Sequence, residues 1–112
     1  MSKEHLGEFE ELVLLMIVLL KDDAYGLAIR NALKEHANRT VTIGGVHGTV
    51  NRLQGKGFIE SNLGGASELR GGRHKRLFTI TSSGKSMLEK SQEMKISLWS
   101  KIPDFALQNT KG

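Results

Sequence analysis

Apolar residues recur at helical spacing in four stretches of the chain, and this pattern predicts the order of its elements. The first predicted helix covers about residues 6 to 20, where an amphipathic turn leads into an unbroken apolar run from Leu12 to Leu20. A helix that is apolar on every side has to be covered on more than one face. A chain of 112 residues has few elements for this, so we expect a second copy of the chain to cover part of it.

The second predicted helix follows a pair of acidic residues. Asp22 and Asp23 are candidates for its N-cap, because a short side-chain oxygen can accept a hydrogen bond from the first turn. Residues 37–40 end it. The positions that recur at helical spacing within it are Tyr25, Ile29, Ala32, Leu33 and His36.

The third predicted helix runs from about Gly45 to Lys56. Residues 41–43 predict a short strand before it, and either Thr42 or the step from Ile43 to Gly44 leads into the helix. Gly57 suits the left-handed residue that commonly ends a helix. The stripe expected to be buried consists of Val46, Val50 and Leu53.

A hairpin and a fourth helix complete the pattern. Residues 58–63 and 74–80 predict two strands, with glycines marking the long connection between them. Thr81 or Ser82 caps the helix, and Pro103 disfavours helix at about residue 102. Its apolar stripe is expected to contain Met87, Leu88, Ser91, Met94, Leu98, Trp99 and Ile102.

The order helix, helix, helix, hairpin, helix predicts a mainly α fold with a small β-hairpin. It is the order of a winged helix-turn-helix followed by one C-terminal helix, with the third helix as the recognition helix and the hairpin as the wing. We expect a DNA-binding domain over residues 1–80, a dimerisation helix over 81–103 and a tail over 104–112.

Composition indicates a positive net charge and the compartment in which the protein is expected. The net charge is +4 with a pI near 9.6, which favours an anionic partner. The chain has no cysteine, so disulfides and thiolate metal sites are excluded and a reducing compartment fits. The run from Leu12 to Leu20 is shorter than the ~20 residues of a membrane span, and acidic residues precede it. We therefore expect a cytoplasmic protein.

The face of the third helix opposite its buried stripe carries groups suited to reading bases. His47, Gly48, Asn51 and Arg52 lie on this arc. Asn can bond adenine with two hydrogen bonds, and Arg can do so with guanine or hold a phosphate. Gly48 leaves room for the backbone to approach a groove wall. The alternative interpretation is an ordinary solvated helix face.

The wing supplies the cations. Gly71 and Gly72 precede Arg73, His74, Lys75 and Arg76, and such a basic loop suits phosphate contacts, which contribute affinity more than sequence reading. The alternative is a charge run that only keeps the protein soluble. The predicted DNA contacts are Thr42, Gly45, His47, Gly48, Asn51, Arg52, Lys56, Arg73, Lys75 and Arg76.

The sequence contains no motif that is typical of an enzyme active site. No serine lies in a nucleophile-elbow pattern, and the four histidines lack metal-ligand spacing. The glycine-rich segment 64–72 lacks the ending of a phosphate-binding loop. We expect no catalysis, no metal and no cofactor. A winged helix that docks on a protein and never touches DNA stays open as the alternative.

Several of these residues together resemble the PadR family of bacterial transcriptional regulators. The similar patterns are residues 6–10, the Tyr25-Gly26 step, Gly72-Arg73 in the wing, and the set Gly44, Val46, Arg52, Leu53, Gly57, Phe58 and Ile59. The resemblance implies a dimeric repressor on a pseudo-palindromic operator. His47 stands where the family usually has a tyrosine, which affects the operator sequence and not the fold.

The resemblance also implies how the dimer forms and how it is controlled. Family members pair through the C-terminal helix, and several release DNA on binding a small aromatic compound. Trp99 and Met94 are the candidate effector contacts, although Trp99 also suits the dimer core. The residues expected in the dimer contact are Leu12, Leu15, Leu19, Met87, Met94 and Leu98.

Overall fold

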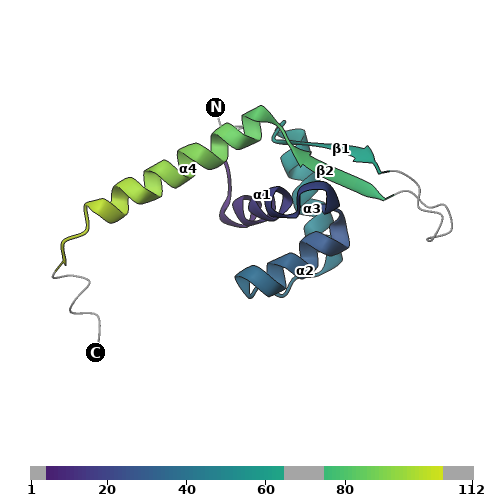
Figure 1. The fold of residues 1–112 in the computed structure, drawn as a ribbon, viewed down its shortest axis with the longest axis horizontal. Coiled ribbons are helices and arrows are strands. Elements are labelled where there is room, and N and C mark those ends of the chain that lie inside the picture. Colours follow the sequence, from purple (N-terminus) through teal and green to yellow (C-terminus); the bar gives the residue numbers. More distant parts are fainter. Residues whose placement is uncertain (1–4, 65–74, 105–112) are drawn as a thin grey trace.

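The computed structural model describes residues 5–64 and 75–104, and it confirms a mainly helical chain with one antiparallel hairpin (Figure 1). A short 3₁₀ turn, Lys21–Asp23, separates the first two helices. The elements in chain order are α1 (Glu8–Leu20), α2 (Gly26–Ala37), α3 (Ile43–Gly55), β1 (Ile59–Leu63), β2 (Arg76–Ile80) and α4 (Ser82–Ser100).

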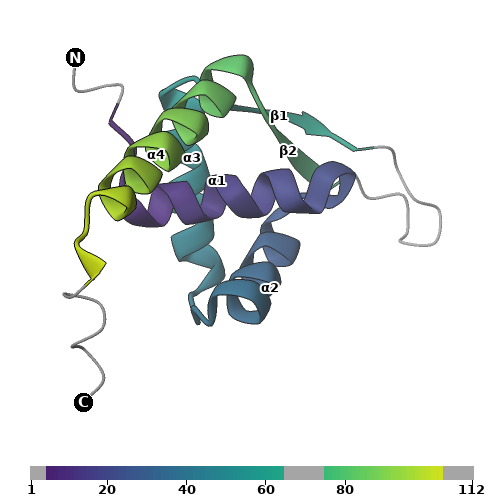
Figure 2. The same cartoon turned by 60° about the vertical axis from the view of Figure 1, so that its left-hand side comes forward.

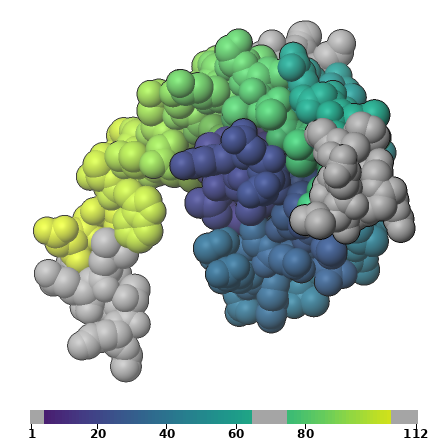
Figure 3. Space-filling model, turned by 45° about the vertical axis from the view of Figure 1, so that its right-hand side comes forward, coloured from purple at the N-terminus to yellow at the C-terminus, as the bar shows by residue number. Residues whose placement is uncertain are grey.

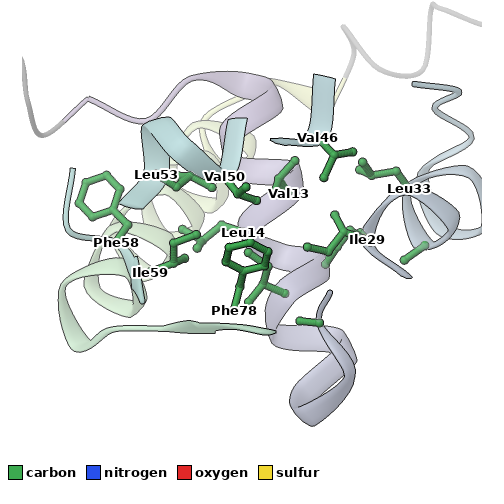
Figure 4. Packing of buried hydrophobic residues seen from close by; sticks show 14 residues of the cluster. Val13, Leu14, Ile29, Leu33, Val46, Val50, Leu53, Phe58, Ile59 and Phe78 are labelled. Carbon is green, nitrogen blue, oxygen red and sulfur yellow. The ribbon is translucent and has the colours of Figure 1, made fainter. Parts of the chain in front are cut away.

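The hydrophobic core lies where α1, α2, α3 and the hairpin meet (Figure 4). Leu14 of α1 and Ile29 of α2 are fully buried, and Phe78 of β2 is only 4% exposed. The stripe predicted for α3 is confirmed, since Val46, Val50 and Leu53 are buried in this cluster. Helical periodicity therefore identified the face of α3 that packs inward, and with it the face left for a partner.

The boundaries of α1 and α2 differ from the prediction. The first helix begins at Glu8 instead of residue 6, because Gly7 is its N-cap and donates its N–H to Glu10 Oε1 at 2.8 Å. Asp22 and Asp23 are not the N-cap of α2: both lie in the 3₁₀ turn, and Tyr25 occupies the cap position. The turn uses the two acidic residues that were predicted as cap candidates for this helix.

The strand predicted over residues 41–43 is wrong, because this segment leads directly into α3. Thr42 is the N-cap, and its Oγ1 accepts a hydrogen bond from the N–H of Gly45 at 3.0 Å. The helix therefore starts at Ile43, earlier than Gly45, and it ends at Gly55. The cap hydrogen bond favours a helical turn at this point over the extended structure that the β-branched residues suggested.

The hairpin is slightly shorter than predicted. Gly57 has φ 81°, which turns the chain so that Phe58 enters the core and the strand begins at Ile59. The strands pair from Ile59 opposite Ile80 to Leu63 opposite Arg76. The N–H of Phe78 donates to the carbonyl oxygen of Ala24 at 2.9 Å, which ties the wing to the connection between α1 and α2. His74, also predicted in the second strand, lies outside the described residues.

The start of α4 is docked on the turn between α3 and β1. Thr81 is its N-cap, as predicted, and the Thr81 hydroxyl also donates to the carbonyl oxygen of Gly57 at 2.7 Å. The helix ends at Ser100 and not at residue 102. Its far half leaves the body as an arm (Figure 3), and the radius of gyration is 17.0 Å. A compact chain of this length would have about 13 Å.

Among the described residues, no helix is both long enough and apolar enough to cross a membrane.

Candidate nucleic-acid interface

A hollow between α2, α3 and β2 brings together four of the ten residues predicted to contact DNA. Its volume is about 570 Å³, and we call it the α3–wing groove. His47 and Asn51 of the recognition helix line it together with Lys75 and Arg76 of the wing. The helix face and the wing cations therefore share one concave surface, as the winged-helix interpretation requires. The other described lining residues are Tyr25, Gly26, Leu27, Arg30, Ile43, Val50 and Phe78.

The groove has an apolar floor and a basic rim. Val50 and Phe78 are buried core residues, whereas Arg30, Lys75 and Arg76 bring cationic groups to the edge. None of the described residues that line it is acidic. A concave surface lined by one sign of charge attracts a partner of the opposite sign, such as a phosphate backbone.

The outward face of α3 is unusually bare. Asn51 is exposed there, and glycine makes up four of the 13 residues of the helix. Each glycine inside a helix costs about 0.5–1 kcal/mol relative to alanine. The helix is therefore held by its cap and its packing more than by its own propensity. The missing side chains let another backbone approach the helix closely.

His47 lies against the first turn of α2. A Cβ atom at Gly26 would come within 2.9 Å of the His47 Nε2 atom, so a larger residue there would require this imidazole to move. The glycine of the Tyr25-Gly26 step therefore lets His47 lie close to the start of α2 while it stays exposed at the groove.

The two described wing cations are both held in place. The Lys75 ammonium lies 3.8 Å from the centre of the Tyr25 ring, a cation–π contact that orients it over α2. The Arg76 Nη2 atom donates to Ser61 Oγ of β1 at 3.2 Å. Arg73, the third predicted wing cation, lies outside the described residues.

Two of the predicted DNA contacts, Arg52 in α3 and Lys56 directly after it, donate hydrogen bonds to a buried carboxylate. Glu10 is 6% exposed, and its oxygens accept hydrogen bonds from Lys56 Nζ at 2.8 and 3.0 Å and from Arg52 Nε at 3.3 Å. Lys56 also donates to the carbonyl oxygen of His5 at 2.8 Å. The geometry gives Lys56 a structural role, whereas the Arg52 side chain remains 57% exposed.

Burial of Glu10 by itself would raise the pKa of its carboxyl group. Hydrogen bonds from the Lys56 ammonium, the Gly7 N–H and the Arg52 guanidinium outweigh this effect and hold the pKa below its usual 4.5. Glu10 is therefore ionised at neutral pH. Sequence reasoning missed this residue, because its partners lie 42 and 46 residues away. Only its place in the first helical turn hinted at a role.

Thr42 and Gly45 have a local role that the prediction did not include. They form the N-cap hydrogen bond of α3, and a Cβ at Gly45 would lie 3.3 Å from Thr42 Oγ1. Both residues are exposed at the start of the recognition helix. They therefore fix where the helix begins, and they remain accessible to a partner.

Arg30 is a second residue that the sequence analysis missed. It lines the α3–wing groove and also a neighbouring hollow of about 310 Å³, where Lys34 and Arg39 add further positive charge. The basic surface therefore extends from the wing along α2. Its signal in the sequence was weak, because Arg30 stands alone among apolar and neutral neighbours.

Most of the apolar residues predicted for a dimer contact are exposed in the single chain. Leu15 and Leu19 of α1 are 42% and 51% exposed, and Met94, Leu98 and Trp99 of α4 are 52%, 56% and 62% exposed. Leu12 and Met87 are partly buried against the core instead. We call these five exposed residues, two on α1 and three on the arm of α4, the apolar strip. The two helices run close to each other where α4 passes the start of α1 (Figure 2).

The comparisons with known proteins agree with this geometry. The model of the transcriptional regulator PadR-like family matches residues 14–90. A search of curated protein sequences gave no significant match.

Solved structures show the same fold at low sequence identity. A PadR family transcription regulator from a hypervirulent Clostridium difficile has a TM-score of 0.72 at 21% identity, with 89% of this chain and 99% of that chain covered. A PadR-like transcriptional regulator from Bacillus cereus has a TM-score of 0.71 at 22% identity, covering 90% and 92% of the two chains. A Streptococcus transcriptional regulator has a TM-score of 0.69 at 20% identity, again covering 90% and 92%.

Proposed function

We propose, from the premise that this chain belongs to the transcriptional regulator PadR-like family, that it binds a pseudo-palindromic operator as a homodimer and represses transcription from it. Members of the family are transcription regulators and not enzymes. The observation that carries the proposal is the α3–wing groove, where Asn51 and His47 of α3 face the same space as Lys75 and Arg76. A surface of this kind accepts a duplex, with α3 in the major groove and the wing on the backbone.

The proposed contacts divide by function. Asn51 and His47 lie on the bare face of α3, where Gly48 permits close approach, and they read or flank bases. Lys75, Arg76 and, from the sequence alone, Arg73 hold phosphates. We add Arg30 to this second group because it lines the groove, and we leave out Lys56 because its ammonium is hydrogen-bonded to Glu10.

The proposed dimer uses the apolar strip on α1 and α4. Leu15, Leu19, Met94, Leu98 and Trp99 would lose most of their exposed surface to a second copy. Two recognition helices about 34 Å apart would then meet successive major grooves on one face of the duplex. A cytoplasmic location and release by a small aromatic compound at Trp99 and Met94 complete the proposal. The alternative for Trp99 is that it only fills the dimer core.

Selection of bound fragments from random duplexes tests the base-reading part. We expect one enriched pseudo-palindrome with the wild-type chain. Asn51→Ala should relax the preference at one base pair in each half-site, with a loss of about 1–3 kcal/mol on the preferred duplex. Selection of no common sequence would contradict sequence-specific binding.

The phosphate contacts are tested with Lys75→Ala plus Arg76→Ala. This variant should weaken binding to every duplex and make the salt dependence shallower by about 0.9 for each lost phosphate contact. Lys85→Ala plus Lys90→Ala is the matched control, because it removes the same charge from exposed positions on α4. Equal losses in both double variants would show that binding responds to net charge only, and the absence of DNA binding by the wild type would favour the protein-docking alternative.

A further inference from the structure

The carboxylate of Glu10 joins the first turn of α1 to the end of the recognition helix. Among the described residues, it is the one charged residue that is buried. Both of its oxygens accept a hydrogen bond from Lys56, at 2.8 and 3.0 Å, and one also accepts from Arg52 at 3.3 Å. The Glu10 carboxylate therefore binds two cations at the end of α3 that could otherwise contact a phosphate backbone.

The two cations are restrained to different degrees. Lys56 has three N–H donors, and its ammonium donates hydrogen bonds to both Glu10 oxygens and to the carbonyl oxygen of His5. Arg52 gives its Nε–H to Glu10 and an Nη2 hydrogen to Thr49 Oγ1 at 3.0 Å. Its Nη1 atom makes no hydrogen bond within the described residues, and it lies beside Gly48 on the helix face. The Lys56 ammonium is thus occupied by its protein partners, while the Arg52 guanidinium is held in place with its Nη1 edge accessible.

The neighbouring Glu11 shows that this arrangement is specific to one position. Glu11 is on the same turn of α1, but its carboxylate pairs with Lys95 at 2.7 Å and with the Ser91 hydroxyl at 2.8 Å, both on α4. Adjacent carboxylates therefore anchor α1 to different helices. Glu10 binds residues at the end of the recognition helix, and Glu11 binds residues on the arm of α4.

We propose that Glu10 is a specificity-determining residue for DNA: it neutralises Lys56 and orients Arg52, so that the end of α3 presents one fixed guanidinium edge in place of two mobile cations. The inference rests on the proposed function. Mobile cations strengthen binding to any duplex, because phosphates are present whatever the bases are. A guanidinium held in one place contributes only where the duplex is docked in one register.

Glu10→Gln should therefore shift the two kinds of binding in opposite directions. The variant removes a negative charge and releases Lys56, which strengthens binding to an arbitrary duplex. It also loosens Arg52, which weakens binding to the preferred duplex. A residue that only supported the fold would lower both affinities together, since it would reduce the folded fraction of the chain.

The experiment measures the affinities of the full chain for its selected duplex and for a scrambled duplex across a salt series. Circular dichroism establishes that each variant is folded at the assay temperature. For Glu10→Gln we expect about two- to fivefold tighter binding to the scrambled duplex, and a salt slope steeper by about 0.9 for each added phosphate contact. Binding to the selected duplex should weaken by about three- to tenfold, on the scale of one displaced charged contact.

Glu11→Gln is the matched control, because it makes the same charge change on the same turn but frees a lysine on α4. Its ratio of selected to scrambled affinity should stay within about twofold of the wild-type ratio. In an Arg52→Ala background, Glu10→Gln should no longer weaken binding to the selected duplex, since the orienting effect acts through Arg52.

Two results separate the failure of this inference from that of the proposed function. A wild-type chain that prefers no duplex overturns both. A wild-type chain with a preference that Glu10→Gln leaves unchanged, or that falls equally on both duplexes, overturns the inference alone. If Glu10→Gln does not fold, Lys56→Met replaces it: we expect both affinities within about twofold of wild type, and a loss of tenfold or more on both would place Lys56 on the phosphates and overturn the proposal.

Discussion

At the scale of single residues, the structural effect of an acidic side chain in this protein depends on how deeply it is buried. The acids Glu8, Glu10 and Glu11 occupy the first turn of α1, where a helix favours negative charge. Glu8 pairs with Arg39 in solvent, and such an exposed pair contributes little to stability. Glu10 is buried between two cations, so the same residue type in the same turn has a much larger structural effect.

The lowered pKa of Glu10 predicts a dependence of stability on pH. A carboxyl group whose pKa is lower in the folded than in the unfolded chain adds stability above its unfolded value, near the usual 4.5. That contribution is lost as the pH falls through the lower folded value. Glu10→Gln should therefore cost about 1–2 kcal/mol at pH 7 and clearly less near pH 3. Urea unfolding at both pH values measures this, and an equal cost at both would contradict it.

At the scale of elements, the joint between the wing and α4 depends on one glycine. Gly84 is buried in the first turn of α4, and a Cβ there would overlap the carbonyl oxygen of Phe58. That oxygen also accepts the N–H of Thr81 at 3.0 Å. The turn after α3 and the start of α4 are therefore in direct backbone contact, and this contact sets the direction of the arm.

Gly84→Ala should destabilise the protein by about 1–3 kcal/mol, the range for overpacking a tight site. Thermal or urea unfolding measures the effect. Gly55→Ala is the matched control, because no atom lies within 4 Å of a Cβ at that helical position, and alanine should be neutral or stabilise by up to about 1 kcal/mol. A Gly84→Ala variant as stable as the control would show that α4 starts farther from Phe58.

At the scale of the whole molecule, the elongated shape and the exposed apolar strip have one explanation. A longest dimension of 59 Å and an exposed fraction of 62% for Trp99 are unfavourable for a lone chain of 12.4 kDa. A second copy on α1 and α4 would cover this surface. The recognition helices would then be presented as a pair, and the geometry of the arm would set their spacing.

Trp99→Glu should convert the dimer to monomer and weaken operator binding strongly, because a charge would be buried at the contact. Sedimentation equilibrium should give twice the chain mass of 12.4 kDa for the wild type and the single mass for the variant. Ser100→Glu, an exposed position that helical spacing places on the face of α4 away from Met94 and Leu98, should remain dimeric. Dissociation by both variants, or by neither, would contradict the proposed contact.

The local patterns of the chain were sufficient for its elements. Helical spacing identified Val46, Val50 and Leu53 as buried, and the threonine before each of the last two helices was recognised as a cap candidate. The errors at residues 22–23 and 41–43 arose where short polar or β-branched segments are compatible with more than one local structure. At residues 41–43 the local cap bond between Thr42 and Gly45 decided for the helix.

What the sequence by itself determined is the order of the elements, the inward face of α3 and the concentration of cations near the wing, because these depend on neighbours within a few residues. Only the tertiary structure decided which cations are available. Glu10 meets Arg52 and Lys56 across more than 40 residues, and Arg30 reaches the groove from another helix. Charge and spacing along the chain do not encode such pairings, because they follow from how packed helices bring distant side chains together.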